Sequence, residues 1–338
     1  MKPKVVRTDK SMYILASQFE HLAAVADVVT TENDEEQTII EAVDGASLIM
    51  VSGATITRKI LEAGRNLKGV LKWGVGTDSV DIAAATELGI PIVHCPHYGP
   101  QSIADFAFAM LMAQAKRLFH INRDMQKLGW MYPLPPFVEP NGSYLGIDLP
   151  NKTVGLIGFG RIGQVMGRRC LGFDMNVLVY DPYQEPNAAN FPQVRFVSLD
   201  RLLQQADFIS IHVVLTPETE GMLGERELSL LKPTAYLINT ARGAVFDQAA
   251  LVTALKEGRI AGAGLDVFLN EPTGLDNPFL TMNNVIVAPH LASYTREAYE
   301  TLDKNALQKA LAILNDEPLW DVKNPEVLQH LKHNVKLT

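Results

Sequence analysis

The sequence predicts an α/β protein with two parallel-sheet domains. Three observations support this prediction. Strand-like and helical segments alternate along the chain, a glycine-rich turn joins a strand to a helix near residue 158, and 338 residues exceed what one hydrophobic core usually organises. Because helices cover both faces of a parallel sheet, its strands should be buried and rich in Val, Ile and Leu.

The first hundred residues alternate short β-branched runs with helical patterns. Strands are expected at 46–51, 69–73 and 90–94, and helices at 57–63 and 81–88. Thr57 and Asp81 are residue types that cap helix N-termini. Gly64 and Gly89 follow the expected C-termini, where glycine is favoured. This part of the chain therefore predicts one α/β unit.

A long helical pattern runs from Gln101 to about Leu128, with apolar residues at steps of three and four. The apolar face that results must be buried. Residues 129–150 then break the periodicity with five prolines and four aromatic residues. They predict a loop, which could be a linker, an oligomer arm or part of a pocket wall.

A second α/β unit begins at Lys152. Its strands are expected at 153–157, 176–180, 208–212, 235–239, 262–266 and 284–288, and its helices after Gly160, at 199–205 and at 248–257. A closing amphipathic helix is expected at 297–314.

Composition and charge exclude several function classes. The 30 Lys and Arg and 38 Asp and Glu give a net charge of −8 without a basic block, so we expect neither nucleic acid nor membrane as a partner. Cys95 and Cys170 are too few for a disulfide framework. His94, Cys95 and His97 lack an acidic partner, so no metal site is expected. Because the N-terminus also lacks an apolar signal core, we expect a cytoplasmic protein, whose partners would be small molecules or protein.

A dinucleotide-binding motif, G-x-G-x-x-G, lies between a buried strand and a helix of the second unit. Gly158 permits a tight turn, Gly160 lets the backbone approach a pyrophosphate, and Gly163 allows close packing of helix and strand. The backbone N–H groups around Arg161 and Ile162, at the positive helix end, would hold the phosphates.

The next strand ends in Asp181, which lies 18 positions after Gly163. An acidic residue there binds a ribose 2′-hydroxyl and repels a 2′-phosphate. Pro182 and Tyr183 supply no cation for such a phosphate. The sequence therefore favours NAD(H) over NADP(H) as the cofactor.

Three further segments place a charged or titratable residue at or beyond the end of an apolar strand, where open α/β sheets bind ligands. Arg242 lies in 237–243, Glu271 in 264–272 and His290 in 287–293. Together with the glycine motif, these segments resemble the NAD-dependent D-2-hydroxyacid dehydrogenase family, which includes phosphoglycerate dehydrogenases and glyoxylate/hydroxypyruvate reductases. The resemblance extends over nearly the whole chain.

The resemblance implies an enzyme that transfers a hydride between NAD and a small D-2-hydroxy acid. His290 would be the acid/base for the hydroxyl proton, because imidazole titrates near neutral pH. Glu271 would fix its tautomer and favour the imidazolium. Arg242 would orient the substrate carboxylate and polarise the carbonyl. Asp266 corresponds to the family's contact with the nicotinamide amide.

The same resemblance implies further binding residues. For the cofactor they are Ser102, His212, Thr216, Thr240 and Ala241. For the substrate they are Ser52, Arg242 and the turn of Gly74, Val75 and Gly76, whose backbone N–H groups would receive the carboxylate.

The resemblance also implies how the domains are divided. A flavodoxin-like substrate domain would be discontinuous, comprising residues 1–99 and 301–338, and a Rossmann NAD-binding domain would comprise residues 100–300. The active site would lie in the cleft between them. Family members usually dimerise through their NAD-binding domains, so we expect a homodimer that buries the helix beginning near Gln101.

The identity of the substrate stays open. Val51 stands where many phosphoglycerate dehydrogenases carry an Arg for the phosphate, although Lys72, Arg58 or Lys59 could substitute. Formate dehydrogenases pair the catalytic His with Gln, so Glu271 disfavours that activity. Two alternatives remain: a phosphite-type oxyanion dehydrogenase, and an NAD(H)-sensing binding protein that resembles the C-terminal-binding corepressors.

Overall fold

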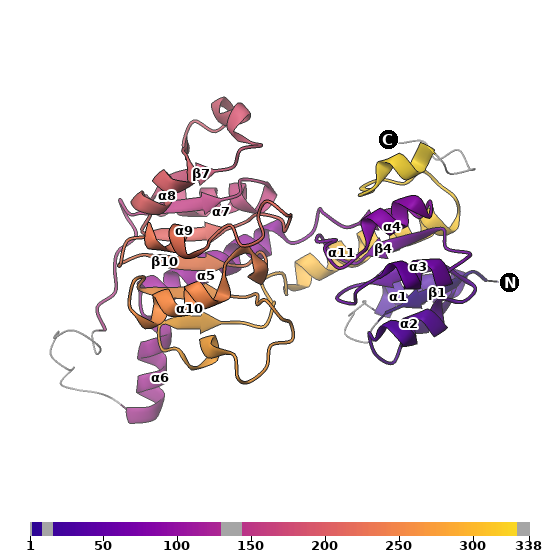
Figure 1. Cartoon of the computed structure of the whole chain (residues 1–338), viewed down its shortest axis with the longest axis horizontal. Helices are drawn as coiled ribbons and strands as arrows, with labels where there is room; N and C mark the ends of the chain where they lie inside the picture. The colour runs from indigo at the N-terminus through magenta and orange to yellow at the C-terminus, as the bar shows by residue number, and fades with distance from the viewer. Residues whose placement is uncertain (1, 9–15, 130–143, 330–338) are drawn as a thin grey trace. The chain divides into compact units, whose positions relative to one another are not determined.

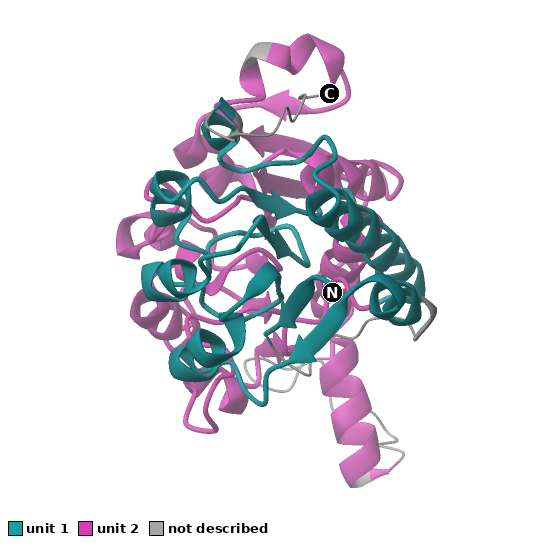
Figure 2. Cartoon of the chain, turned by 90° about the vertical axis from the view of Figure 1, so that its right-hand side faces the viewer, with its two compact units in different colours: residues 1–99, 295–338 teal, residues 100–294 magenta. Residues whose placement is uncertain are grey.

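The chain forms two compact units, which we call unit 1 (residues 1–99 and 295–338) and unit 2 (residues 100–294; Figure 1, Figure 2). The computed structural model describes residues 2–8, 16–129 and 144–329. Each unit holds one sheet, and the paired strands of both sheets are parallel. The predicted α/β class with two parallel sheets is therefore confirmed.

Unit 1 contains a five-stranded sheet in the flavodoxin-like order β2-β1-β3-β4-β5. Its strands are β1 (Lys4–Arg7), β2 (Asp27–Thr30), β3 (Ala46–Val51), β4 (Gly69–Lys72) and β5 (Ile92–His94). Side chains alternate across the sheet, so in β3 Leu48 and Met50 join one core while Ile49 and Val51 join the other. The three strands expected here from apolar runs are present.

Helices cover both faces of this sheet. The first face packs against α1 (Ala16–Val25) and α11 (Arg296–Leu314), and the second against α2 (Glu36–Val43), α3 (Arg58–Ala63) and α4 (Ile82–Glu87). The Asp81 carboxylate accepts the Ala84 N–H (2.8 Å) and caps α4. The chain returns to unit 1 at Thr295, so α11 belongs to unit 1 as a whole, whereas a boundary at residue 300 would divide this helix.

The C-terminal tail adds to the edge of the unit 1 sheet at β5. Val322 forms an antiparallel bridge with Val93, and a short 3-10 helix, η4 (Pro325–Gln329), follows. The ammonium of Lys309, a residue that is 1% exposed, lies 2.6 Å from the Asp321 carboxylate. Because an unpaired buried charge is strongly destabilising, this ion pair ties the tail to α11 and β5.

Unit 2 contains a seven-stranded sheet in the order β12-β11-β10-β9-β6-β7-β8. Its strands are β6 (Thr153–Ile157), β7 (Asn176–Tyr180), β8 (Arg195–Phe196), β9 (Phe208–Ile211), β10 (Tyr236–Asn239), β11 (Gly262–Leu265) and β12 (Val285–Val287). The strand order reverses between β6 and β9, as in Rossmann folds. Ligands bind at such a switch point, beyond the carboxyl ends of the strands.

Two layers of helices enclose the unit 2 sheet. On one side lie α5 (Pro100–Ala115) and α7 (Arg161–Leu171), and on the other α8 (Leu199–Gln205), α9 (Glu225–Ser229) and α10 (Gln248–Lys256). Short 3-10 helices lie at Glu185–Asn190 (η1), Gly243–Val245 (η2) and Pro278–Thr281 (η3). Helix α5 packs on α7, β10 and β11, which cover its buried residues within unit 2, and the expected burial of this helix by a partner chain stays a prediction.

The helix predicted from Gln101 to Leu128 is in fact two helices. Helix α5 ends at Ala115, and α6 (Leu118–Leu128) begins after Arg117, whose φ of 51° is left-handed. The Ala115 carbonyl accepts the N–H of Ile147 (2.8 Å), so a distant segment replaces the next helical hydrogen bond. Residues 130–143 of the predicted proline-rich loop lie outside the described residues.

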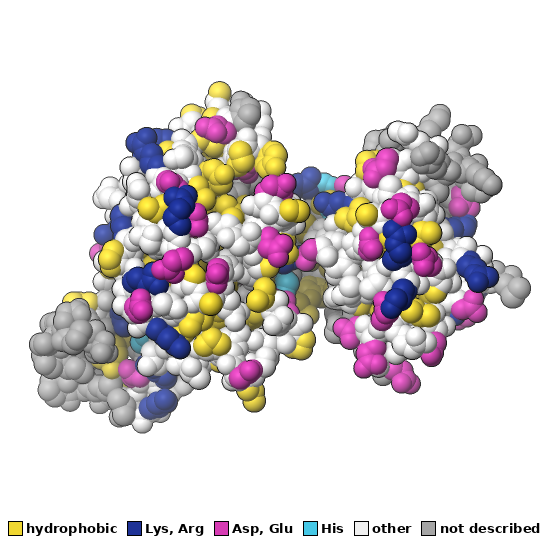
Figure 3. All heavy atoms as spheres, in the orientation of Figure 1, with side chains coloured by type: hydrophobic (Ala, Val, Ile, Leu, Met, Phe, Trp, Pro, Cys, Tyr) yellow, Lys and Arg dark blue, Asp and Glu magenta, His cyan; other side chains and the backbone are white. Residues whose placement is uncertain are grey.

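On the face drawn in Figure 3, the basic side chains are scattered among acidic ones, and several acidic side chains gather at the lower edge of unit 1. Among the described residues, no helix is long and apolar enough to cross a membrane.

Candidate active site

The glycine turn after β6 lies at the switch point of the unit 2 sheet. Gly158 has a φ of 92°, a conformation that L side chains rarely adopt. A Cβ at this position would lie 2.7 Å from the carbonyl carbon of His212, the residue that follows β9. The backbones at the two sides of the switch point are therefore too close for any residue other than glycine.

The other two glycines of the motif differ in the space around them. A Cβ on Gly163 would lie 2.3 Å from the Gly158 carbonyl oxygen, whereas one on Gly160 would meet no described atom within 4 Å. Helix α7 starts directly beyond this open space with Arg161 and Ile162, whose turn presents backbone N–H groups. The cradle in front of Gly160 fits the pyrophosphate of a dinucleotide.

Asp181 lies at the end of β7 and is bonded to the glycine turn. One carboxylate oxygen accepts the Phe159 N–H (2.7 Å), and the other accepts the N–H groups of Tyr183 and Gln184 (3.0 Å each). A carboxylate oxygen accepts more than one hydrogen bond, so Asp181 retains acceptor capacity for a ribose hydroxyl. The residue predicted as a ribose ligand thus also fixes the shape of the turn.

His290 and Glu271 form a hydrogen-bonded pair beyond β12 and β11. The distance from His290 Nδ1 to Glu271 Oε2 is 2.6 Å, and Glu271 Oε1 accepts the Phe268 N–H at 2.8 Å. Burial acts to raise the pKa of Glu271, but the hydrogen bond and charge of His290 lower it overall. The carboxylate is therefore ionised at neutral pH. Since the His290 side chain is 46% exposed, its second ring nitrogen can reach a ligand.

The backbone of His290 adopts an uncommon conformation, with a φ of 56°. Its N–H donates to the Asp266 carbonyl oxygen (2.7 Å), and the Asp266 carboxylate accepts the N–H groups of Leu291 (2.8 Å) and Ala292 (2.9 Å). Burial raises the pKa of Asp266 in spite of these hydrogen bonds. Asp266 therefore orders the loop that carries His290, a role that its sequence position did not reveal.

Arg242 lies beyond β10, on a loop that touches the Glu271 loop. The Asn239 side chain donates to the Arg242 carbonyl oxygen (2.8 Å) and accepts the Ala241 N–H (2.9 Å). A Cβ on Gly243 would lie 2.0 Å from the carbonyl carbon of Phe268, so the two loops meet backbone to backbone. The sheet edge therefore brings together a guanidinium-bearing loop, a carboxylate and an imidazole.

The remaining candidate cofactor residues of unit 2 differ in their surroundings. Thr240 Oγ1 is buried and has no hydrogen-bond partner among the described residues, as expected of a hydroxyl that binds a ligand. His212 Nε2 lies 2.9 Å from Ser210 Oγ, and burial lowers the pKa of His212 to about 3, so its ring is neutral. Thr216 lies in the loop after β9, and Ser102 in the first turn of α5.

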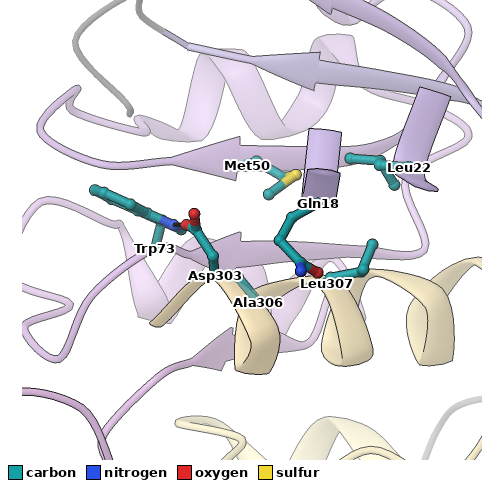
Figure 4. Close-up of a pocket in the computed structure, with 7 residues that line it drawn as sticks. All are labelled: Gln18, Leu22, Met50, Trp73, Asp303, Ala306 and Leu307. Carbon is teal, nitrogen blue, oxygen red and sulfur yellow. Dashed lines mark hydrogen bonds between the residues drawn. The ribbon is translucent and has the colours of Figure 1, made fainter. Parts of the chain in front are cut away.

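In unit 1, the glycine turn at 74–76 follows β4. Trp73, which precedes the turn, donates its indole N–H to the buried carboxylate of Asp303 in α11 (2.9 Å). The two side chains face each other beside a small pocket between α1 and α11 (Figure 4). Besides Trp73, Asp303 and Gln18, the residues that line this pocket are the apolar Leu22, Met50, Ala306 and Leu307. We therefore assign no polar substrate to it.

Lys72 and Ser52 lie close together beside this turn. Lys72 is buried at the end of β4, and its ammonium donates to the Ser52 carbonyl oxygen and to Ser79 Oγ (3.2 Å). The backbone of Ser52, a candidate substrate residue, therefore binds a lysine of its own unit.

Comparisons with known proteins identify the family of this chain. Residues 108–292 match the sequence family described as "D-isomer specific 2-hydroxyacid dehydrogenase, NAD binding domain". A glyoxylate reductase from Korarchaeum cryptofilum is 39% identical over 295 residues, which cover 87% of each chain. A D-3-phosphoglycerate dehydrogenase from Archaeoglobus fulgidus is 36% identical over 270 residues, which cover 80% of this chain and 50% of that one. A crystal structure of D-lactate dehydrogenase from Aquifex aeolicus, complexed with NAD and lactic acid, has a TM-score of 0.83 and 30% identity over 99% of this chain and 100% of that one.

Gly158→Ala should prevent NADH binding, because the added Cβ would push the turn away from His212. We expect the Kd for NADH, measured by fluorescence titration, to rise at least about a hundredfold. Gly172→Ala at the other end of α7 is the matched control, since its φ is −65° and its Cβ would lie 3.4 Å from the nearest atom. Equal Kd values for the two variants would show that the turn does not bind the cofactor.

Proposed function

This chain belongs to the D-isomer specific 2-hydroxyacid dehydrogenase family, and on that premise we propose that it interconverts a small D-2-hydroxy acid and its 2-oxo acid with NAD as cofactor. The observation that carries the proposal is the His290–Glu271 hydrogen bond of 2.6 Å, next to the Arg242 loop. Oxidation of a hydroxyl to a carbonyl requires a base for the proton, and a carboxylic acid substrate requires a cation.

Each of these side chains has one role in the proposed reaction. When bound, NAD(H) accepts or supplies the hydride. His290 takes the hydroxyl proton during oxidation and returns it during reduction, through the ring nitrogen that does not face Glu271. Glu271 stabilises the imidazolium that oxidation produces. Arg242 binds the substrate carboxylate and polarises the carbonyl oxygen.

We assign different parts of the reaction to the two units. Unit 2 contains the family match, the glycine turn and Asp181, so we assign the cofactor to it, with Thr240 as a further ligand. Unit 1 is then the substrate domain, in which the half-buried residues Val75 and Gly76 bind the substrate carboxylate through their N–H groups. The N–H of Gly74, the third residue expected to bind it, instead donates to the Lys72 carbonyl oxygen (3.0 Å). The remaining candidate residues keep the binding roles that the resemblance implies; these are Ala241, Asp266, Ser102, His212, Thr216 and Ser52.

We favour a substrate without a phosphate group. Arg58 and Lys59 of α3 form surface ion pairs, with glutamate oxygens at 2.6 and 3.2 Å. Lys72 is held by Ser52 and Ser79. The three cations that could replace the missing phosphate-binding Arg are therefore engaged by the protein itself. This supports glyoxylate or hydroxypyruvate over 3-phosphohydroxypyruvate.

Turnover of a panel of 2-oxo acids tests the proposal. NADH oxidation is followed with glyoxylate, hydroxypyruvate, 3-phosphohydroxypyruvate, pyruvate and a branched 2-oxo acid, and we expect one of the first two to have the highest kcat/KM. His290→Ala should lower kcat at least about a hundredfold, because the proton loses its carrier. Its Kd for NADH should stay within about twofold, because the ring is not part of the glycine turn. Arg242→Ala should lose turnover with the whole panel.

Three outcomes would contradict this proposal. If the protein bound NADH but reduced no 2-oxo acid, the NAD(H)-sensing alternative would be favoured. Oxidation of phosphite with NAD would favour the oxyanion dehydrogenase. If His290→Ala lost NADH binding together with turnover, its role as acid/base would be wrong.

Asp181→Ala should weaken NADH binding and reduce the discrimination against NADPH. The carboxylate both anchors the turn at Phe159 and would repel a 2′-phosphate. We expect the Kd for NADH to rise about tenfold and the Kd for NADPH to rise less. Asp200→Ala, which removes an exposed carboxylate paired with Arg226, is the matched control. If the ratio of the two Kd values were unchanged, a residue other than Asp181 would contact the ribose.

We also propose that the protein is a homodimer assembled through α6. This helix extends away from the body of unit 2 in both views (Figure 1, Figure 2) and exposes Leu118 (57%), Phe119 (54%), Ile121 (38%) and Met125 (43%). A contiguous apolar surface of this kind is unfavourable in water. Replacing Phe119 and Met125 by Glu should convert a dimer into a monomer in sedimentation velocity, and a monomeric unmodified protein would contradict the proposal.

The cytoplasmic location stays a prediction.

Cys95 and Cys170 are buried free thiols, and burial raises their pKa values to about 11 and about 12. Protonated thiols of this kind are poor nucleophiles, as expected of structural cysteines.

A further inference from the structure

The glycine turn of unit 1 is held by the end of strand β5. The Gly74 carbonyl oxygen accepts the backbone N–H of Cys95 (2.9 Å), and the Val75 carbonyl oxygen lies 2.9 Å from His94 Nδ1. Because a carbonyl oxygen only accepts, Nδ1 carries the proton and donates it. Two consecutive carbonyl groups of the turn therefore point toward β5.

This arrangement fixes the direction of two N–H groups. In a trans peptide, the carbonyl and the N–H of the following residue point in opposite directions, and these peptides are trans. The N–H groups of Val75 and Gly76 therefore point away from β5. Within the described part of the chain neither N–H donates to a protein acceptor, and both residues are only half-buried. Two adjacent donors of this kind form an anion-binding site.

Only one of the two anchors depends on a side chain. Almost any residue at position 95 could donate its backbone N–H, but the Val75 carbonyl is held by the ring of His94. That ring is buried, and burial lowers its pKa to about 4, so it is neutral at physiological pH. The backbone of His94 is itself braced, because its N–H donates to the Asp321 carbonyl (3.1 Å) and its carbonyl accepts the Lys309 ammonium (2.5 Å).

We propose that His94 is a positioning residue, which holds the Val75 carbonyl and thereby aims the Gly76 N–H at the substrate carboxylate. This inference rests on the proposed function, in which the turn binds a 2-oxo acid. His94 acts through the Val75–Gly76 peptide and does not touch the substrate. Without its hydrogen bond the peptide can rotate, and fewer molecules present the N–H in the binding direction.

Two substitutions separate the hydrogen bond from the packing of the ring. His94→Leu keeps apolar bulk but removes the donor, whereas His94→Asn places an amide nitrogen near the position of Nδ1. With the best 2-oxo acid of the panel, His94→Leu should raise KM about tenfold. Its kcat should stay within about twofold, because the carboxylate is bound alike in the ground and transition states. His94→Asn should restore KM to within about threefold of the original value.

The Kd for NADH provides the internal control, because the glycine motif for the cofactor lies in unit 2. This Kd should be the same in the unmodified protein, in His94→Leu and in His94→Asn. An unchanged KM in His94→Leu would overturn the proposal, and so would equal rises in both variants, since these would indicate a packing role for the ring. If His94→Leu does not fold, His94→Gln replaces it: its amide nitrogen is one bond farther out, so its KM should exceed that of His94→Asn.

The hydrogen bond can also be tested without turnover. In 15N-labelled protein, the Gly76 amide resonance should move in His94→Leu and stay close to its original position in His94→Asn. An unmoved resonance in His94→Leu would refute positioning by His94, whatever the activity. If no 2-oxo acid were turned over, the proposed function would be refuted. The resonance measurement would still decide whether His94 holds the glycine turn.

Discussion

Where the loop after β10 passes the loop after β11, the backbones of Gly243 and Phe268 are so close that a Cβ would lie 2.0 Å from a carbonyl carbon. This contact constrains the distance between Arg242, which directly precedes Gly243, and Glu271, which lies three residues after Phe268. Because both loops start from strands of one buried parallel sheet, the cation and the carboxylate are positioned before any ligand binds. Such preorganisation lowers the entropic cost of orienting a substrate.

Acidic side chains hold these loops in place by accepting backbone N–H groups. Asp181 binds the glycine turn, Asp266 binds the loop of His290, and Glu271 binds the N–H of Phe268. Hydrogen bonds to an ionised carboxylate are stronger than those between neutral groups, so each loop is well fixed. The residues that we assign to ligands or to proton transfer are therefore also structural, and their substitution changes both properties.

His94 and His290 both direct Nδ1 at the protein, but they differ in the partner of that nitrogen. His290 faces the Glu271 carboxylate and is 46% exposed, and we assign the proton transfer to it. His94 faces the Val75 carbonyl and is 8% exposed, so its ring stays neutral and acts only as a donor. The partner and the burial, more than the residue type, decide whether a histidine serves as an acid/base or as a fixed hydrogen-bond donor.

The sequence by itself determined the features that depend on neighbours along the chain. The strands β3, β6 and β7 have their predicted bounds because a buried strand is a local run of apolar residues, and the glycine motif follows β6 as predicted. Only the tertiary structure decided the helix break at Arg117, where Ile147 takes a carbonyl of α5, the ordering role of Asp266, and the hydrogen bond from His94 to Val75. The physical reason is that periodicity reports which face of one element is buried, whereas these features depend on contacts between segments that lie far apart in the sequence.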